Sequence, residues 1–287
     1  GRSASTMSQL LQGAVPNMTV SFSSGRAGDG GSFNIRGVNS ISGSAKPLVL
    51  IDGVEGDVNR VNPNDVASVS VLKDASSAAI YGARAANGVI LVTTKRGKEG
   101  KVKLNYSGNV SFSQPTRVPK MLNAYQYATY VNEFDAAQGN SLTYPETALT
   151  KIKDGSDPIN YPDTNWWNAV AKDWATNTEH SLAISGGNEK ISFYSSAQYM
   201  YQDVIYKNSP QNYNQYQFST NLDAKITKAI KFGFDILGRQ TVDNRGVRTT
   251  EDLFSYFLTT SPMSAPYYPN GLLRTGYDGI TNNAVLM

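Results

Sequence analysis

The chain has 287 residues, of which 40% are hydrophobic and 17% charged, so it is long and apolar enough for one large or two ordinary folded domains. Its 26 Lys and Arg residues are scattered and exceed the 23 Asp and Glu by only three, which argues against a nucleic-acid partner. The absence of cysteine excludes thiol catalysis, disulfides and thiolate metal sites, and a single histidine cannot build a multi-histidine metal site. No apolar run reaches the length of a transmembrane helix, whereas the aromatic and glycine content favours β structure. We expect a β-rich protein without a cofactor.

The first 100 residues predict a compact α+β unit, because short apolar runs alternate with turn and capping residues. The short run 47–51 stops at Asp52-Gly53, as a buried strand entering a turn does. The expected elements, in chain order, are a helix around Leu10 and Leu11 ending near Gly13, strands at 18–22 and 33–38, a strand at 47–51, a helical turn capped at 62–65, a strand at 69–72, a helix at 75–81 capped by Asp74 and ended by Gly82, and a strand at 89–94.

From Lys101 onward, apolar residues recur with period two over long runs, which predicts extended strands. The apolar sets are Val102, Leu104, Tyr106, Val110 and Phe112; Leu182 and Ile184; Ile191, Phe193, Ala197, Tyr199 and Tyr201; Tyr216, Phe218, Leu222, Ala224 and Ile226; and Ile230, Phe232, Phe234 and Ile236. The runs reach the 9–11 residues of a membrane-crossing strand, and soluble strands average about 5–6.

The connections between these strands alternate in length. Turns near Gly187 and Lys228 are tight, whereas 114–176, 203–212 and the residues after 240 are long. This alternation is typical of membrane barrels with short periplasmic turns and long outer loops. The polar residues on the opposite parity suit a wet lumen, although the solvent face of a soluble sandwich would look the same.

Several candidate chemical sites have plainer readings. The glycine cluster at 25–31 lacks the Walker lysine and reads as a turn-rich loop. Asp52, Glu55 and Asp57 do not have EF-hand spacing and read as a solvated turn. The carboxylate pairs Glu133–Asp135 and Asp154–Asp157 read as surface charge, and His180, which no Ser or Cys motif accompanies, reads as loop-proximal or lumen-facing.

Aromatic residues gather in the first long connection, where Trp166 and Trp167 are adjacent. Aromatic faces are natural platforms for sugar rings or peptide side chains. The alternative, slightly favoured for the tyrosines, is that the residues from Asn123 to Gln138 form a helix and pack within the loop itself.

Six motifs that follow one another in order carry a resemblance to a known family. They are Asn34-Ile35-Arg36-Gly37, the run from Pro47 to Val54, Asn62-Pro63-Asn64-Asp65-Val66, the run from Val71 to Ser76, Ile80-Tyr81-Gly82, and the run from Ala86 to Lys95. This string resembles the plug domain of TonB-dependent outer-membrane transporters of the SusC/RagA type, found in Bacteroidetes. The stretch 182–190 is similar to the early barrel strands of the same family. The resemblance therefore implies a plug domain at 1–100 and the beginning of an outer-membrane β-barrel with long extracellular loops at 101–287.

The resemblance implies an α+β plug domain followed by antiparallel strands of an incomplete transmembrane β-barrel. The family's barrel has about 22 strands, which need roughly 220 residues before any loop is counted, whereas roughly 187 follow residue 100 here. Gly1 also begins inside the plug pattern, so we expect the TonB box, any N-terminal extension and most of the barrel to be missing from this sequence.

The resemblance further implies a gated importer in the cell outer membrane, surrounded by outer-membrane lipid. Its implied partners are the TonB–ExbB–ExbD complex, a SusD-like surface lipoprotein and an oligosaccharide or peptide substrate, and it performs no enzymatic reaction. In related transporters plug arginines face barrel carboxylates, which suggests Arg36 and Arg96 as latch residues whose partners lie in the missing barrel. Substrate or partner contacts are expected from exposed loop residues, namely Trp166, Trp167, Tyr267 and Tyr268.

Two other hypotheses remain open at the level of sequence. One is a surface-attached carbohydrate-binding β protein without transport activity, which would be soluble without detergent. The other is a secreted glycoside hydrolase with an unrecognised carboxylate pair, which would show turnover that depends on one Asp or Glu.

Overall fold

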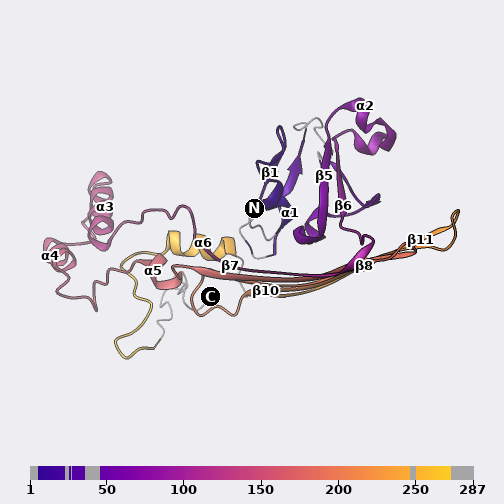
Figure 1. Cartoon of the computed structure of the whole chain (residues 1–287). Helices are drawn as coiled ribbons and strands as arrows, with labels where there is room; N and C mark the ends of the chain where they lie inside the picture. Colours follow the sequence, from indigo (N-terminus) through magenta and orange to yellow (C-terminus); the bar gives the residue numbers. More distant parts are fainter. Residues whose placement is uncertain (1–5, 23–25, 27, 36–45, 246–249, 273–287) are drawn as a thin grey trace. The chain divides into compact units, whose positions relative to one another are not determined.

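The computed structural model of the chain describes residues 6–22, 26, 28–35, 46–245 and 250–272 (Figure 1). The chain forms two compact units. The first unit combines Gly1–Ser111, Thr176–Asp203 and Asn212–Asp243, and the second combines Phe112–Ala175, Val204–Gln211 and Asn244–Met287. The N-terminal segment and the long strands therefore belong to one compact unit.

The N-terminal segment contains a four-stranded sheet of order β4-β3-β6-β5, in which β3 and β6 run parallel. The main helix and the strands of the N-terminal segment are α1 (Met7–Leu11), β1 (Thr19–Ser21), β2 (Ser32–Asn34), β3 (Leu48–Ile51), β4 (Val54–Glu55), β5 (Val66–Leu72) and β6 (Val89–Thr94). The apolar sequences of β3 and β6 explain their central positions, and Val89, Ile90 and Val92 are almost fully buried. Ile90 and Val92 pack with Met7 of α1, Phe33 of β2 and Val58 of the 3₁₀ turn Val58–Arg60.

Short helical turns connect these strands at the positions that the capping residues predict. Asn62 caps the 3₁₀ turn Pro63–Asp65, and its side chain accepts a hydrogen bond from the Asn64 amide. Asp74 occupies the N-cap of α2 (Ala75–Ala78) without a side-chain capping bond. Two further 3₁₀ turns, Ala79–Tyr81 and Ala83–Ala85, meet at Gly82, whose φ of 70° favours glycine.

β1 and β2 form a separate antiparallel pair. Five long strands form a further sheet of the first unit, in the order β11-β10-β9-β8-β7. They are β7 (Gly100–Ser113), β8 (Ala175–Gly187), β9 (Ile191–Asp203), β10 (Asn212–Lys225) and β11 (Lys231–Asn244). β9 pairs antiparallel with both β8 and β10. Each strand has 13 or 14 residues, so the prediction of unusually long strands is confirmed.

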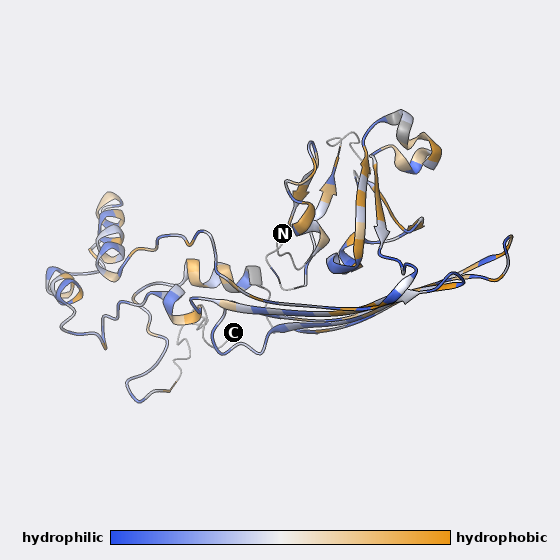
Figure 2. Ribbon diagram, in the orientation of Figure 1, coloured by the Kyte–Doolittle hydropathy of each residue, from blue (hydrophilic) through white to orange (hydrophobic). Residues whose placement is uncertain are grey.

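The two faces of the long sheet have opposite character, as the period-two pattern predicts. Hydrophilic and hydrophobic residues both occur along the long strands in Figure 2. One face carries exposed apolar side chains, among them Val102, Leu104, Leu182, Ile184, Tyr216, Phe218, Phe232 and Phe234. The other face carries polar side chains that are mostly buried, among them Glu179, Ser181, Ser196, Gln198, Gln215, Gln217, Ser219 and Asn221. A soluble sheet buries its apolar face, so this arrangement is inverted.

Within its described residues, the second unit contains four helices: α3 (Ala124–Ala137), α4 (Glu146–Asp154), α5 (Trp166–Val170) and α6 (Thr250–Thr259). The expected helix near 123–138 is α3, which Asn123 caps in a reciprocal arrangement with Gln126. Ala124 and Ala128 of α3 pack against Ile152 of α4, and Phe257 of α6 packs against α5. Among the described residues, no helix has both the length and the hydropathy required to cross a membrane.

Candidate functional site

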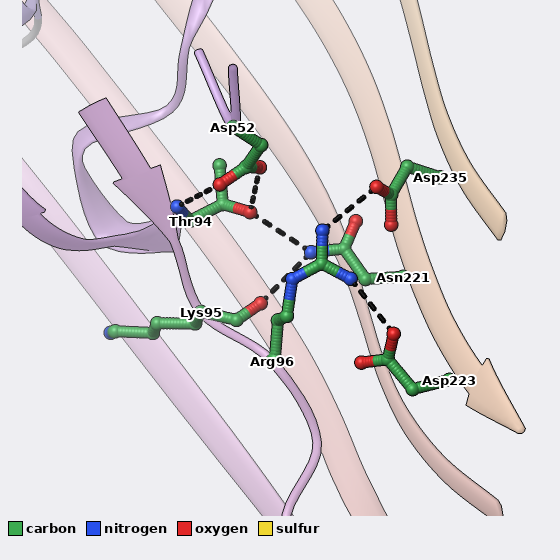
Figure 3. A network of polar contacts seen from close by, with 7 residues as sticks. All are labelled: Asp52, Thr94, Lys95, Arg96, Asn221, Asp223 and Asp235. Atoms are coloured by element: carbon green, nitrogen blue, oxygen red, sulfur yellow. Dashed lines mark hydrogen bonds and ion pairs between the residues drawn. The ribbon is translucent and has the colours of Figure 1, made fainter. Parts of the chain in front are cut away.

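The candidate site is the set of polar contacts between the N-terminal segment and the buried polar face of the long sheet. β6 ends at Thr94, and residues 95–99 lead directly into β7. The guanidinium of Arg96 lies in this connection and reaches two strands (Figure 3). Its Nη1 is 3.1 Å from Oδ1 of Asp223 on β10, and its Nη2 is 2.8 Å from Oδ2 of Asp235 on β11. Arg96 therefore joins the connection to two neighbouring strands at once.

The Arg96 ion pairs are partly open to solvent. The exposed fraction of the Arg96 side chain is 35%, and those of Asp223 and Asp235 are 43% and 46%. The hydrogen bond to Asp235 is the main reason that the pKa of Arg96 is raised above its already high value, so the guanidinium stays charged. Because water screens partly exposed pairs, each contributes at most about 1 kcal/mol. The contact is specific in geometry but can be broken without a large cost.

Asn221, on β10, holds the end of β6 beside Arg96. Its side-chain amide donates to Oγ1 of Thr94 at 3.0 Å and to the carbonyl oxygen of Lys95 at 2.9 Å. Asp52 orients Thr94 in turn, because its carboxylate accepts from the Thr94 amide at 2.9 Å and from the Thr94 hydroxyl at 2.5 Å. Figure 3 shows this chain of contacts from the N-terminal sheet to β10.

The backbone after Arg96 approaches β9 closely. A Cβ at Gly97 would lie 2.3 Å from the backbone nitrogen of Phe193 and 2.4 Å from its carbonyl oxygen. Real Cβ atoms do not come this close to backbone atoms. Glycine at position 97 therefore permits the approach that places Arg96 over β10 and β11.

A second contact is buried and centres on Asp65, at the end of the 3₁₀ turn 63–65. The Tyr194 hydroxyl donates to Asp65 Oδ1 at 2.8 Å, and the Ser196 hydroxyl donates to Oδ2 at 2.6 Å. Asp65 is only 3% exposed. Burial raises the pKa of Asp65, while the hydrogen bonds from Ser196 and Tyr194 and the charge of Lys95 act against that rise.

Glu179 of β8 forms the neighbouring contact and is also buried. Its Oε1 accepts from the side-chain amide of Asn64 at 3.0 Å and from that of Gln198 at 2.7 Å. The amide of Asn62 lies 3.3 Å from the Ser181 hydroxyl. The 3₁₀ turn 63–65 before β5 is thus joined to β8 and β9 through two carboxylates, Asp65 and Glu179, which accept hydrogen bonds from neutral donors.

A third contact involves the loops near residues 28 and 59. Arg239 of β11 donates to the Asn59 carbonyl oxygen at 3.3 Å and to the Tyr213 hydroxyl at 2.7 Å. The Gly28 amide donates to the side chain of Gln202 at 2.7 Å. Side-chain hydrogen bonds, together with the ion pairs of Arg96, therefore join the N-terminal segment to the long sheet at all three contacts. Such polar contacts hold two surfaces in register, and each can exchange its partner for water when the surfaces separate.

The predicted latch residues have different outcomes. Arg36 lies outside the described residues. Arg96 does face carboxylates of the long strands, but the expectation that its partners lie in a missing part of a barrel is wrong, because Asp223 and Asp235 belong to this chain. No local pattern specifies the register of β10 and β11, so neither carboxylate could be singled out from the sequence.

The four aromatic contact candidates lie in the second unit. Trp166 is 3% exposed, packs with Val170 and Phe257, and donates its indole N–H to the Ser261 carbonyl oxygen at 2.9 Å. The expectation that Trp166 is an exposed loop residue is therefore wrong. Trp167 is half-buried against the Phe257 ring, whereas Tyr267 and Tyr268 are exposed.

The candidate calcium ligands are engaged separately. Asp52 accepts from Thr94, Glu55 pairs with Arg84, and Asp57 accepts from the Asn59 amide. In the part of the chain that the structure describes, no three acidic or histidine side chains are grouped as a metal site would require.

His180 is exposed on the same face of β8 as Leu182, where its Nδ1 lies 2.7 Å from the Tyr106 hydroxyl. It therefore lies within β8 on the apolar face of the sheet, so of the two interpretations, loop-proximal or lumen-facing, the second is wrong.

Residues that the sequence did not single out carry most of the interface: Asp65, Glu179, Tyr194, Asn221, Asp223 and Asp235. A signal for the strand residues was present, because Glu179, Asn221, Asp223 and Asp235 all occupy the polar parity of their strands. The strand pattern does not show that another segment of the chain covers this polar face, and that information was needed to single these residues out.

Comparisons with known proteins agree with this geometry. Residues 1–89 match the family model of the TonB-dependent receptor plug domain. The chain is 36% identical over 239 residues to TonB-dependent receptor P26 of Formosa agariphila, covering 81% of this chain and 23% of the relative. It is 32% identical over 224 residues to TonB-dependent receptor SusC of Bacteroides thetaiotaomicron, covering 74% of this chain and 20% of the relative.

Among solved structures, the RagAB peptide transporter superposes with a TM-score of 0.78 at 26% identity, covering 98% of this chain and 34% of that one. The chain spans about a fifth of the length of the curated relatives that it matches. The agreement of the plug model, the curated relatives and the solved transporter shows that this chain belongs to the TonB-dependent receptors, in their SusC/RagA branch.

Proposed function

We propose that the chain supplies the plug and the first wall strands of a receptor that imports oligosaccharide or peptide nutrients across the bacterial outer membrane. Residues 1–100 are the plug in this proposal, and the strands from Gly100 onward begin the barrel, with the second unit formed by its outer loops. The exposed apolar face of the long sheet supports a lipid environment, because an apolar surface of this extent is unfavourable in water.

The single observation that carries the proposal is the pairing of Arg96 with Asp223 and Asp235. A plug must close the lumen at rest and separate from the wall when pulled. Partly exposed ion pairs and side-chain hydrogen bonds suit this task, because each is weak by itself and re-forms when the same partners meet again. Arg96 is therefore a proposed latch residue. Arg36 is the second proposed latch residue, on the ground of the family resemblance alone.

The energy for separation would come from the TonB–ExbB–ExbD complex acting on the plug. A SusD-like lipoprotein would cover the outer mouth, and Trp167, Tyr267 and Tyr268 are the proposed aromatic contacts for that partner or for substrate. Trp166 would act indirectly, by packing the helix α5, which also carries Trp167. The similar RagAB complex is a peptide transporter, which supports peptide as one substrate class.

The latch is tested with Arg96→Gln in the full-length receptor. The substitution removes the charge while keeping a hydrogen-bonding side chain, so we expect severalfold higher basal conductance in planar bilayers. Asp235→Asn is expected to act in the same direction, and the double variant to leak no more than either single variant.

Arg84→Gln is the matched control, because Arg84 pairs with Glu55 inside the plug itself and does not touch the wall. Conductance of Arg96→Gln equal to that of wild type, together with unchanged uptake, would remove Arg96 from the latch. Recovery of the wild-type receptor outside the outer-membrane fraction would defeat the importer proposal as a whole.

A further inference from the structure

Lysine side chains gather at one end of the long sheet. Because neighbouring strands run antiparallel, the start of β7, β9 and β11 and the end of β8 and β10 meet at the same end, joined by the short turns 188–190 and 226–230. Six exposed lysines lie here: Lys98, Lys101, Lys190, Lys225, Lys228 and Lys231. The opposite end of β9 closes with Asp203, and that of β11 with Asp243 and Asn244. The sheet therefore has a basic end.

Four of these lysines line a hollow of about 500 Å³, namely Lys98, Lys190, Lys225 and Lys231. The acidic side chains that line the same hollow are Glu99, Glu189 and Asp223. Asp223 is already paired with Arg96, so two carboxylates face four ammonium groups. The hollow carries a positive excess that an anion would neutralise.

The hollow also has an apolar side. Ile191 and Phe232 line it together with the lysines, and their exposed fractions are 47% and 54%. Ile226 and Ile230, in the turn beside it, are exposed by 64% and 57%. These residues continue the apolar face of the long sheet up to the lysines. A ligand that fills this place needs a negative group and a hydrocarbon part.

We propose that this basic end binds the headgroup of an anionic phospholipid, with the phosphate among the lysines and the start of an acyl chain against Ile191 and Phe232. The inference rests on the proposed function, because it requires the apolar face to lie in a membrane. Lysines near a lipid surface strengthen the binding of anionic lipid, and their long side chains reach from the edge of an apolar belt to the headgroups. The site would fix the height of this end of the sheet in the inner leaflet.

The test uses the full-length receptor, purified in nonionic detergent and depleted of lipid. Native mass spectrometry measures binding of dioleoyl phosphatidylglycerol, and of dioleoyl phosphatidylcholine as the zwitterionic comparison. The variant Lys190→Gln/Lys225→Gln/Lys231→Gln removes three charges around the hollow, and we expect it to bind phosphatidylglycerol at least about tenfold more weakly than wild type. The control Lys120→Gln/Lys151→Gln/Lys153→Gln removes three exposed charges from the second unit and should bind as wild type does.

The outcomes separate the two proposals. Equal phosphatidylglycerol binding by the hollow variant and wild type overturns the lipid site, as does equal affinity for the two lipids. Full competition by inorganic phosphate assigns the hollow to small anions and also overturns it. If the wild-type receptor is found in the outer-membrane fraction in each of these cases, only the lipid site fails; its absence from that fraction defeats the importer proposal as well.

Discussion

Carboxylates occupy two contrasting settings at the interface between the plug and the long sheet. Asp223 and Asp235 are partly exposed and face the permanent charge of Arg96. Asp65 is buried and faces hydroxyl groups, which stabilise its charge less than a cation does. The buried setting of Asp65 couples the interface to protonation, because burial raises the pKa of this carboxyl.

This contrast predicts a pH dependence at Asp65. Burial raises the pKa of Asp65 in the folded protein, so the folded state holds this proton more tightly than the unfolded chain does. Its contribution to stability is full below the ordinary carboxyl pKa of about 4 and is lost as pH rises through the raised value. Calorimetry of the detergent-solubilised receptor should show a fall in unfolding temperature from pH 4 upward, and Asp65→Asn should reduce that fall.

Asp154→Asn is the control for this experiment, because the pKa of Asp154 is lowered, chiefly by its hydrogen bonds with Ser156, and its effect on stability has the opposite sign. The fall from pH 4 upward should therefore persist in Asp154→Asn. A fall of the same size in Asp65→Asn and wild type would show that other groups cause it.

At the scale of elements, local signals predicted the strands and caps well. The alternation of apolar and polar residues located β9, β10 and β11. Asn62 marked the start of the 3₁₀ turn 63–65, and Asn123 marked the start of α3. The start of β8 was missed, because its first five residues, Ala175–Glu179, carry no apolar alternation and gain their place by pairing and by contact with the plug. The short helices α4, α5 and α6 were also missed, since helices of this length depend on tertiary packing.

Gly97 shows how an element boundary depends on a close backbone approach. Gly97→Ala would place a Cβ against the backbone of Phe193, so the connection from β6 to β7 must shift away from β9. We expect a loss of about 1–3 kcal/mol in stability and faster proteolysis of residues 95–99. Gly238→Ala in β11 is the control, because a Cβ there meets nothing within 4 Å, and it should behave as wild type. Proteolysis of Gly97→Ala at the wild-type rate would contradict the close approach.

At the scale of the whole chain, long-range register decided what the sequence could not. Arg96 contacts residues 127 and 139 positions away, and no local pattern specifies which residues of β10 and β11 meet it. The motif resemblance identified the plug and the family, while the pairing of particular side chains needed the register between β9 and β10 and the position of the plug on the sheet. The period-two pattern predicted two faces of opposite character, but the burial of the polar face became evident only from its contacts with the plug.

The inverted sheet makes a prediction that labelling can check, since this sequence contains no cysteine. Single cysteines at Leu182 and Phe218 lie on the apolar face, and those at Ser181 and Gln217 lie on the buried polar face. After spin labelling of the reconstituted receptor, the first two should be accessible to oxygen dissolved in the lipid, and the second two should be protected from it. Because side chains alternate along a strand, accessibility should change with period two from residue 215 to 219. Uniform accessibility along this stretch, or oxygen access at Gln217 equal to that at Phe218, would place the sheet outside the membrane.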